Sequence, residues 1–280
     1  MTPRIARAAV AALMLVPGVL AAQSWRTLDV SRQLHDSTPL LVRLDHTAGS
    51  LDLGAADTPL LYVAHLRYNA ERVQPVYAFT PATRTLRVGT ARRDDSRSLD
   101  EKSAGELRVG LTPRAPLDLE LHLGAVKADL DLSRLRIDHL KVESGASEAT
   151  VRFDVPNAER MRALDFDVGA ASLTATRLAN ANADNIRVKA AVGSVDLDFG
   201  GSWSQDVELA LDMQLGSASL RVPRDVGVRV DASRMLMGFE HDGLTKRGDA
   251  WYSDNWDSAR YKLRVQSRML VGRLELNRSE

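Results

Sequence analysis

Three pairs of aspartates, each with one residue between its members, recur along the chain: Asp129/Asp131, Asp165/Asp167 and Asp196/Asp198. In a β-strand, residues i and i+2 point to the same face and lie about 7 Å apart. Two carboxylates at roughly that separation suit the catalytic pair of a glycoside hydrolase. The same pattern also satisfies the solvent-exposed face of an ordinary strand. A polysaccharide-active site and a row of solvated charges therefore both remain open.

The histidines and the other acidic residues show no recognised ligand spacing. The six histidines are far apart and form no metal-binding pattern: His35, His46, His65, His122, His139 and His241. An acidic group near the C-terminus could hold calcium but lacks the ordered spacing of a calcium loop: His241, Asp242, Asp249, Asp254 and Asp257. Motifs of serine hydrolases, zinc peptidases, P-loops and dinucleotide-binding folds are absent from the sequence. We expect no enzymatic activity, no metal site and no cofactor.

Composition narrows the class of protein. The 280 residues contain 37 basic and 37 acidic side chains, so the overall charge does not favour a nucleic-acid partner. Hydrophobic residues make up 44% of the chain, enough for a substantial core. The absence of cysteine from the sequence excludes disulfides and lipidation of the lipoprotein type. The protein must be held together by packing and hydrogen bonds alone.

The N-terminus has the pattern of a secretory signal peptide. Arg4 and Arg7 precede the uncharged, mostly apolar run 8–22, which ends in small residues. We expect residues 1–22 to be removed, which leaves an extracytoplasmic protein, periplasmic or secreted, without a transmembrane anchor. An uncleaved anchor is the alternative, although the run is shorter than the roughly 20 residues that span a bilayer. No other segment of the sequence is apolar enough to cross a membrane.

Glycines flanked by alternating apolar residues dominate the second half of the chain. Successive glycines are mostly 21 to 24 residues apart, with one last interval of 34: Gly124, Gly145, Gly169, Gly193, Gly216, Gly238 and Gly272. Apolar residues stand five, three and usually one position before the glycine, and the alternation resumes after it. Alternation with period 2 indicates strands that bury one face. We predict a single-domain, all-β β-solenoid with strand–Gly–strand rungs of about 22 residues and one shared core.

Polar positions between the apolar ones are expected to form ladders of charge on the outside. They are Glu120/His122, Lys141/Glu143, Asp165/Asp167, Arg187/Lys189 and Glu208/Asp212. We expect Asp165 and Asp167 to lie opposite Lys141 and Arg187/Lys189, because cross-strand charge pairs stabilise a sheet. A carboxylate-lined groove for sugar or calcium is the alternative interpretation. Turns between rungs are expected at 154–157, 180–182 and 200–202.

The two ends of the chain are less regular. Residues 23–115 form an N-terminal β region with a charged loop at 90–104, and residues 116–280 carry the repeats. The segment 239–261 holds five aromatic residues: Phe239, Trp251, Tyr252, Trp256 and Tyr261. We expect these aromatics to cap the exposed end of the stack. The alternative is that they bind a partner or a glycan.

Several stretches resemble the bacterial toast-rack proteins, which are related to the putative-adhesin β-solenoids and to the C-terminal domain of LiaF-type cell-wall-active antibiotic response proteins. The resemblance lies in 111–120, Gly124, 128–132, 220–228 and the Trp251–Trp256 segment, and it extends over about residues 40–277. It implies a toast-rack type β-solenoid with no known enzymatic activity. LiaF-like regulators carry transmembrane helices before this domain, whereas this chain has only the predicted signal peptide.

Three functions follow as hypotheses. The first is a non-enzymatic scaffold or adhesin-like binding module of the cell envelope, whose partner is an envelope protein or polysaccharide and not a nucleic acid. The second is a soluble sensor of envelope stress related to LiaF. The third is a polysaccharide-active enzyme built on a β-solenoid. The sequence leaves the oligomeric state open.

Overall fold

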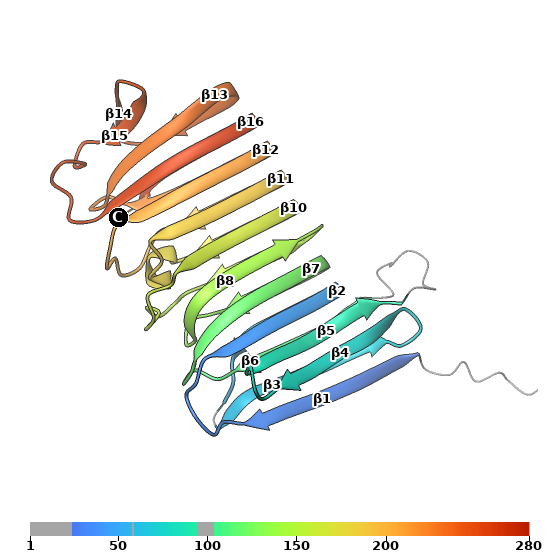
Figure 1. The fold of residues 1–280 in the computed structure, drawn as a ribbon. Helices are drawn as coiled ribbons and strands as arrows, with labels where there is room; N and C mark the ends of the chain where they lie inside the picture. The colour runs from blue at the N-terminus through green and yellow to red at the C-terminus, as the bar shows by residue number, and fades with distance from the viewer. Residues whose placement is uncertain (1–23, 58, 94–103, 280) are drawn as a thin grey trace, which may run out of the picture.

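The structure, a computed structural model, describes residues 24–57, 59–93 and 104–279. The described chain is almost entirely β, with a single short 3-10 helix over Leu178–Ala181 (Figure 1). The predicted all-β class is therefore confirmed. The predicted signal peptide and most of the charged loop lie outside the described residues.

A stack of parallel strands forms the body of the molecule. Neighbouring strands pair in register, and in Figure 1 they lie side by side from one end of the molecule to the other. In spatial order the stack comprises β2 (Leu40–Ala55), β7 (Pro116–Asp131), β8 (Arg136–Ser144) followed in line by β9 (Glu148–Arg152), β10 (Ala163–Thr176), β11 (Asn185–Asp198), β12 (Val207–Pro223), β16 (Lys262–Ser279) and β13 (Gly227–His241). We call each long strand, or two short strands in line, a rung.

The N-terminal end of the stack is built differently. One more rung consists of β5 (Thr85–Arg92) and β6 (Gly105–Leu111), which pair in parallel with the first and second halves of β2. Antiparallel strands then cover this rung: β4 (Val73–Thr80) on β5, β3 (Leu60–Asn69) on β6, and β1 (Trp25–Gln33) on β3. A short hairpin of β14 (Leu244–Arg247) and β15 (Ala250–Ser253) lies against β13 at the opposite end.

Each rung has a first half and a second half, before and after the change of phase described below, and both halves contribute side chains to one core. In β7, Leu121 and Leu123 are buried before Gly124, whereas Val126 and Ala128 are buried after it. The buried face therefore changes phase by one residue at the glycine. Nearly every described element belongs to this one sheet. The apolar faces of the first and second halves of the rungs, before and after the change of phase, therefore cover each other. Buried side chains from both predicted regions, 23–115 and 116–280, join one cluster, and the boundary between the regions stays a prediction.

The glycines stack only in part of the molecule. Gly193, Gly216 and Gly272 are direct neighbours on three successive rungs, and each has a positive φ. Gly169 is out of this row, because Ala171 is the residue that pairs with Gly193. One expectation was wrong for this reason: Val192 and Leu215, one position before their glycines, are exposed and not in the core. Val168 stands one position before Gly169, whereas its partner Ala190 stands three positions before Gly193. The bend of these rungs therefore begins two residues earlier relative to the glycine.

Asparagine side chains tie the predicted turns together. Asn157 Nδ2 donates to the carbonyls of Ile137 (2.7 Å) and Ala181 (3.2 Å), one on the rung before and one on the rung after. Asn180 repeats this arrangement, with its amide donating to the carbonyl of Phe153 (2.7 Å) and its oxygen accepting from the N–H of Ser202 (2.8 Å). Buried backbone groups at the turns are thereby satisfied without regular sheet pairing.

The order of rungs departs from the order of the chain after β12. The last strand, β16, lies between β12 and β13, so β13 is the terminal rung. The 34-residue interval between the last two glycines corresponds to this crossing, because the chain makes the β14–β15 hairpin before it returns as β16. Among the described residues, no helix has the length and apolar character needed to cross a membrane.

Candidate functional site

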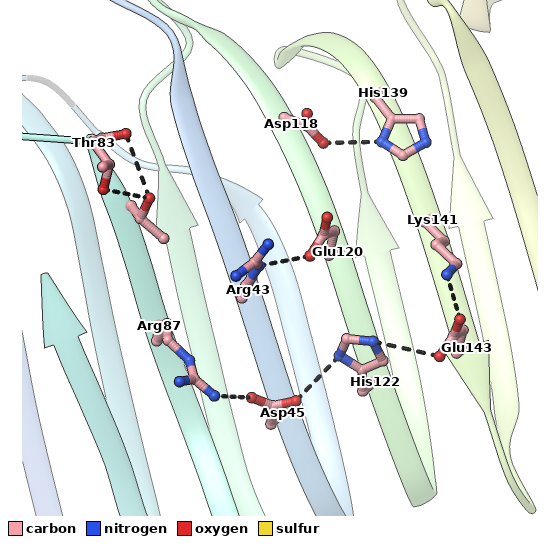
Figure 2. Close-up of polar contacts among 11 residues, drawn as sticks. Arg43, Asp45, Thr83, Arg87, Asp118, Glu120, His122, His139, Lys141 and Glu143 are labelled. Atoms are coloured by element: carbon pink, nitrogen blue, oxygen red, sulfur yellow. Dashed lines mark hydrogen bonds and ion pairs between the residues drawn. The ribbon is translucent and has the colours of Figure 1, made fainter. Parts of the chain in front are cut away.

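A ladder of polar side chains covers the outer face of the first halves of the rungs (Figure 2). Alternation places these residues outside because their neighbours in sequence point into the core. We call this surface the polar ladder; it consists of Arg43, Asp45, Arg87, Asp118, Glu120, His122, His139, Lys141, Glu143 and Asp165. Its members come from five strands, β5, β2, β7, β8 and β10.

One column of the ladder runs through Arg43, Glu120, Lys141 and Asp165 and continues to Arg187 on β11; these residues are successive partners in the register. Arg43 Nε lies 2.7 Å from Glu120 Oε2, and Arg187 lies 3.5 Å from Asp165. The prediction that Asp165 lies between Lys141 and Arg187 is confirmed. Opposite charges thus alternate along these five residues, whereas at the β5 end Arg43 pairs in the register with a like charge, Arg87.

Asp167 lies in the neighbouring column, and its surroundings differ from the prediction. Its partners in the register are Glu143 on one side and Lys189 on the other. The expected contact with Lys141 is absent because Lys141 stands one column away, beside Asp165. Glu208 pairs in the register with Asn185 of β11.

Two histidines bridge carboxylates of different rungs. His122 Nδ1 lies 3.1 Å from Asp45 Oδ1 on the preceding rung, and its Nε2 lies 3.4 Å from Glu143 Oε2 on the following one (Figure 2). His139 repeats the arrangement, 2.9 Å from Asp118 and 3.9 Å from Asp165. An imidazolium in this position donates to both carboxylates, whereas a neutral ring donates to one.

The same geometry does not suit a metal ion. The carboxylates of Asp45 and Glu143 approach opposite nitrogens of His122, so the three groups do not converge on one point. Within the described ranges, no group of three or more His, Asp or Glu side chains is placed to hold a metal. The ladder is a network of hydrogen bonds and ion pairs.

Contacts within the ladder favour its ionised forms. The hydrogen bond from Lys141 lowers the pKa of Glu143, and the Lys141 ammonium has a raised pKa for the same reason. Both side chains therefore carry their charges at neutral pH. Lys141 and Glu143 thus form a pair of opposite charges within the ladder.

A groove runs beside the ladder, at the end of the first halves. It has a volume of about 570 Å³ and is lined by Asp45, His122, Glu143, Asp167, Thr47 and Ser144, among others. His46 forms part of its wall but is itself buried, with Nδ1 3.2 Å from Thr90 Oγ1. The groove offers carboxylates, hydroxyls and an imidazole within one concave surface.

The aspartate pairs singled out in the sequence belong to the outer faces. Asp129 lies 2.7 Å from Arg152 on the next rung, and Asp131 accepts a hydrogen bond from the N–H of Ser133. Hydrogen bonding by the Ser133 side chain, and secondarily by its N–H, lowers the pKa of Asp131. Asp198 likewise accepts from the N–H of Gly200. These carboxylates are engaged with cations and turns.

The five aromatic residues of 239–261 separate into groups. Phe239 and Trp251 pack against the core, with ring centroids 5.7 Å apart, and His241 lies 4.4 Å from Trp251. Tyr252 and Trp256 form a second, T-shaped pair at 5.6 Å. Arg229 and Arg247 approach Tyr252, Lys262 and Arg264 approach Trp256, and Arg260 stacks on Tyr261. All five are partly buried, and their role in binding stays a prediction.

Two acidic residues of the same segment form ion pairs with arginines. Asp242 lies 3.1 Å from Arg224, and Asp257 lies 3.1 Å from Arg247. Each carboxylate thus has a cation as its nearest ionic partner. The calcium alternative finds no converging ligands among these residues.

Comparison with known proteins adds the family. No curated protein matches the sequence. The structure is similar to that of a "putative cell adhesion protein" from Clostridium sporogenes (14% identity, 91% of this chain and all of that chain covered, TM-score 0.47). It is also similar to a "putative adhesin" from Bacteroides fragilis (12% identity, 91% and 98% covered, TM-score 0.44). Residues 22–175, more than half of the chain, match the model of the N-terminal domain of toast-rack, DUF2154, and the chain therefore belongs to the toast-rack family.

Proposed function

We propose that this protein is a non-enzymatic, adhesin-like binding module of the cell envelope, built as a β-solenoid and located outside the cytoplasm. Its partner is an envelope protein or polysaccharide, which it binds along the polar ladder. The observation that carries the proposal is the bridging of rungs by His122 and His139, which fixes polar groups of several rungs in one arrangement.

Columns of residues that occupy the same position on successive rungs support the interpretation as a solenoid. Leu121, Val142, Phe166, Val188 and Leu211 are buried neighbours on five successive rungs. Parallel neighbours repeat about every 4.8 Å, so any outward group is repeated at the same interval along the stack. A stack of this kind is suited to an extended partner that makes equivalent contacts on successive rungs.

A preorganised polar surface supports binding in preference to catalysis. The general acid of a glycoside hydrolase needs a raised pKa. Among the described carboxylic acids with a shifted pKa, namely Asp36, Asp131 and Glu143, the pKa is lowered in each. Such carboxylates stay ionised and serve as acceptors for donors of a partner.

The experiment is a binding assay with the purified protein and two separated envelope fractions, one of polysaccharide and one of protein. We expect saturable binding to one fraction, weakened at least about tenfold by His122→Ala or Glu143→Gln. Asp129→Asn, a matched change on the outer face of the second halves, is expected to bind as the unaltered protein does.

Three results would contradict this proposal. The first is binding unaffected by the ladder variants, and the second is release of reducing sugars from the polysaccharide fraction. The third is loss of binding on Trp256→Ala with both ladder variants unaffected, which would move the binding surface to the aromatic end.

A further inference from the structure

An apolar ridge runs along the bend of three rungs, away from the polar ladder's histidines. It consists of Val192 on β11, Leu215 on β12, and Leu270 and Val271 on β16, with exposed fractions of 46, 49, 51 and 38%. These are four of the six large apolar side chains that are exposed in the described part of the chain. Monomeric proteins rarely gather exposed aliphatic side chains in one place without an interaction partner.

The ridge is continuous because the register aligns its members. Val192 pairs with Leu215, and Leu215 pairs with Val271. Beside them lies a groove of about 580 Å³, whose lining includes Ala191, Met213 and Met269. The surface is therefore an apolar strip that extends over neighbouring rungs, and not four isolated residues.

A column of alternating charge borders the ridge on one side. In spatial order it contains Asp167, Lys189, Asp212 and Arg268, one on each of β10, β11, β12 and β16. Arg268 holds Asp212 through two contacts of 2.6 and 3.1 Å, so these two side chains are oriented along the column. The order of signs is minus, plus, minus, plus.

This order is complementary to its own reverse. Consider a two-fold axis at right angles to the stack, lying in the plane of contact between β11 and β12. It brings the column of a second copy alongside in the opposite direction, so that Lys189 faces Asp212 of the second copy and Asp167 faces Arg268 of the second copy. The same axis sets Val192 against Leu215 of the second copy. The four charges of the column and the Val192–Leu215 contact match at once, as an isologous interface requires, while Leu270 and Val271 face β10 of the second copy.

We propose that the ridge is the interface of a homodimer in which two copies associate with their stacks antiparallel. A purely cationic or anionic partner would meet two repelling charges along the column, whereas a second copy meets none. The ridge and the charge column together provide eight residues, fewer than the roughly 20–30 per partner of a standard stable interface. The dimer is therefore weak, and the dimeric fraction rises with protein concentration.

Sedimentation velocity across a concentration series tests the proposal. We expect the purified protein to shift from monomer to dimer with rising concentration. Leu215→Arg is expected to raise the dissociation constant at least about tenfold, because a buried anchor is replaced by a charge. Val155→Arg is the matched control: Val155 is 51% exposed but lies in a turn away from the ridge, so the dimer is expected to persist.

Charge reversal tests the antiparallel arrangement. Lys189→Glu and Asp212→Lys are each expected to weaken self-association, because each creates two like-charge pairs across the axis. An equimolar mixture of the two variants is expected to form a heterodimer, since both cross-axis pairs are then attractive. Thermal unfolding of every variant verifies that the fold is retained.

Three outcomes would overturn the proposal. A protein that stays monomeric at all concentrations excludes the dimer. A dimer that survives Leu215→Arg has a different interface, and a mixture that fails to associate excludes the antiparallel two-fold. Flotation with phosphatidylcholine vesicles adds a further arm, because a monomer that binds these vesicles through Leu215 would make the ridge a lipid contact instead.

Discussion

Gly216 lies directly beside Gly193 on the neighbouring rung, so close that a Cβ atom on Gly216 would stand 1.9 Å from the carbonyl oxygen of Gly193. Gly216 also has a φ of +145°, a backbone conformation that side chains rarely tolerate. The bend of the rungs therefore requires glycine for two reasons, close approach and backbone conformation. The core on both sides of the bend depends on this geometry.

Gly216→Ala is expected to lower the free energy of unfolding by more than about 3 kcal/mol, or to prevent folding, because backbone atoms must move. Gly54→Ala is the control, since its Cβ would make only ordinary contacts, the nearest at 3.6 Å. Urea unfolding followed by circular dichroism measures both. Equal midpoints for the two variants would refute the role given to Gly216.

Asn157→Leu is expected to cost about 2–4 kcal/mol of stability. The side chain satisfies the carbonyls of Ile137 and Ala181 and accepts from the N–H of Ile137 at 3.0 Å, and leucine leaves all three buried groups unpaired. Asn277→Leu, an exposed asparagine at the end of β16, is expected to change stability by less than about 0.5 kcal/mol. A loss of stability as small for Asn157→Leu as for Asn277→Leu would argue against a stabilising role for the asparagine hydrogen bonds at the turns.

Stability is expected to fall with acidification through His46. Burial lowers the pKa of His46 to about 4, although the backbone of Ser50 and Gly105 acts in the opposite direction. A neutral histidine is thus favoured in the folded state, while the unfolded chain binds its proton near pH 6.5. This contribution is complete above pH 6.5 and decreases as pH falls toward about 4, by about 3 kcal/mol in all.

Urea titrations at several pH values test this expectation. His46→Leu is expected to show a weaker decline of stability between pH 6.5 and 4 than the unaltered protein. His35→Leu, at an exposed histidine, is expected to leave the decline unchanged. Parallel curves for the protein and its His46 variant would exclude His46 as the source.

Trp251→Ala is expected to destabilise the C-terminal end by about 2 kcal/mol or more, because Trp251 packs on the core together with Phe239. Trp256→Ala is expected to cost less, since its ring contacts are Tyr252 and the cations of Lys262 and Arg264. Hydrogen exchange of β13 amides resolves the difference locally. If Trp256→Ala opened β13 as strongly as Trp251→Ala, the two aromatic groups would share one structural role.

The orientation of His122 could be predicted from the sequence, but its contacts could not. Alternation along 116–131 predicted that His122 faces outward, and it does. That it lies between Asp45 and Glu143 depends on β2 pairing with β7, two strands separated by sixty residues that include β3 to β6. Nothing in the local pattern specifies that pairing, because any strand with the same period offers an equivalent edge.

The apolar ridge was missed for a related reason. Leu123 and Leu215 both precede a glycine in an alternating strand, yet Leu123 is buried and Leu215 is half exposed. The difference comes from where the bend falls relative to the glycine, which is set by register with the neighbouring rung.

Period-2 alternation, glycines and turn asparagines by themselves determined that this chain is all-β and, away from the bends, which side chains face the core, because these properties depend on neighbours in sequence. The tertiary structure alone decided that β16 lies between β12 and β13, that histidines bridge rungs, and that an apolar ridge remains outside. Those features depend on which strands pair and in which register. Several strands offer similar edges, so the pairing is determined only by burial of the whole core.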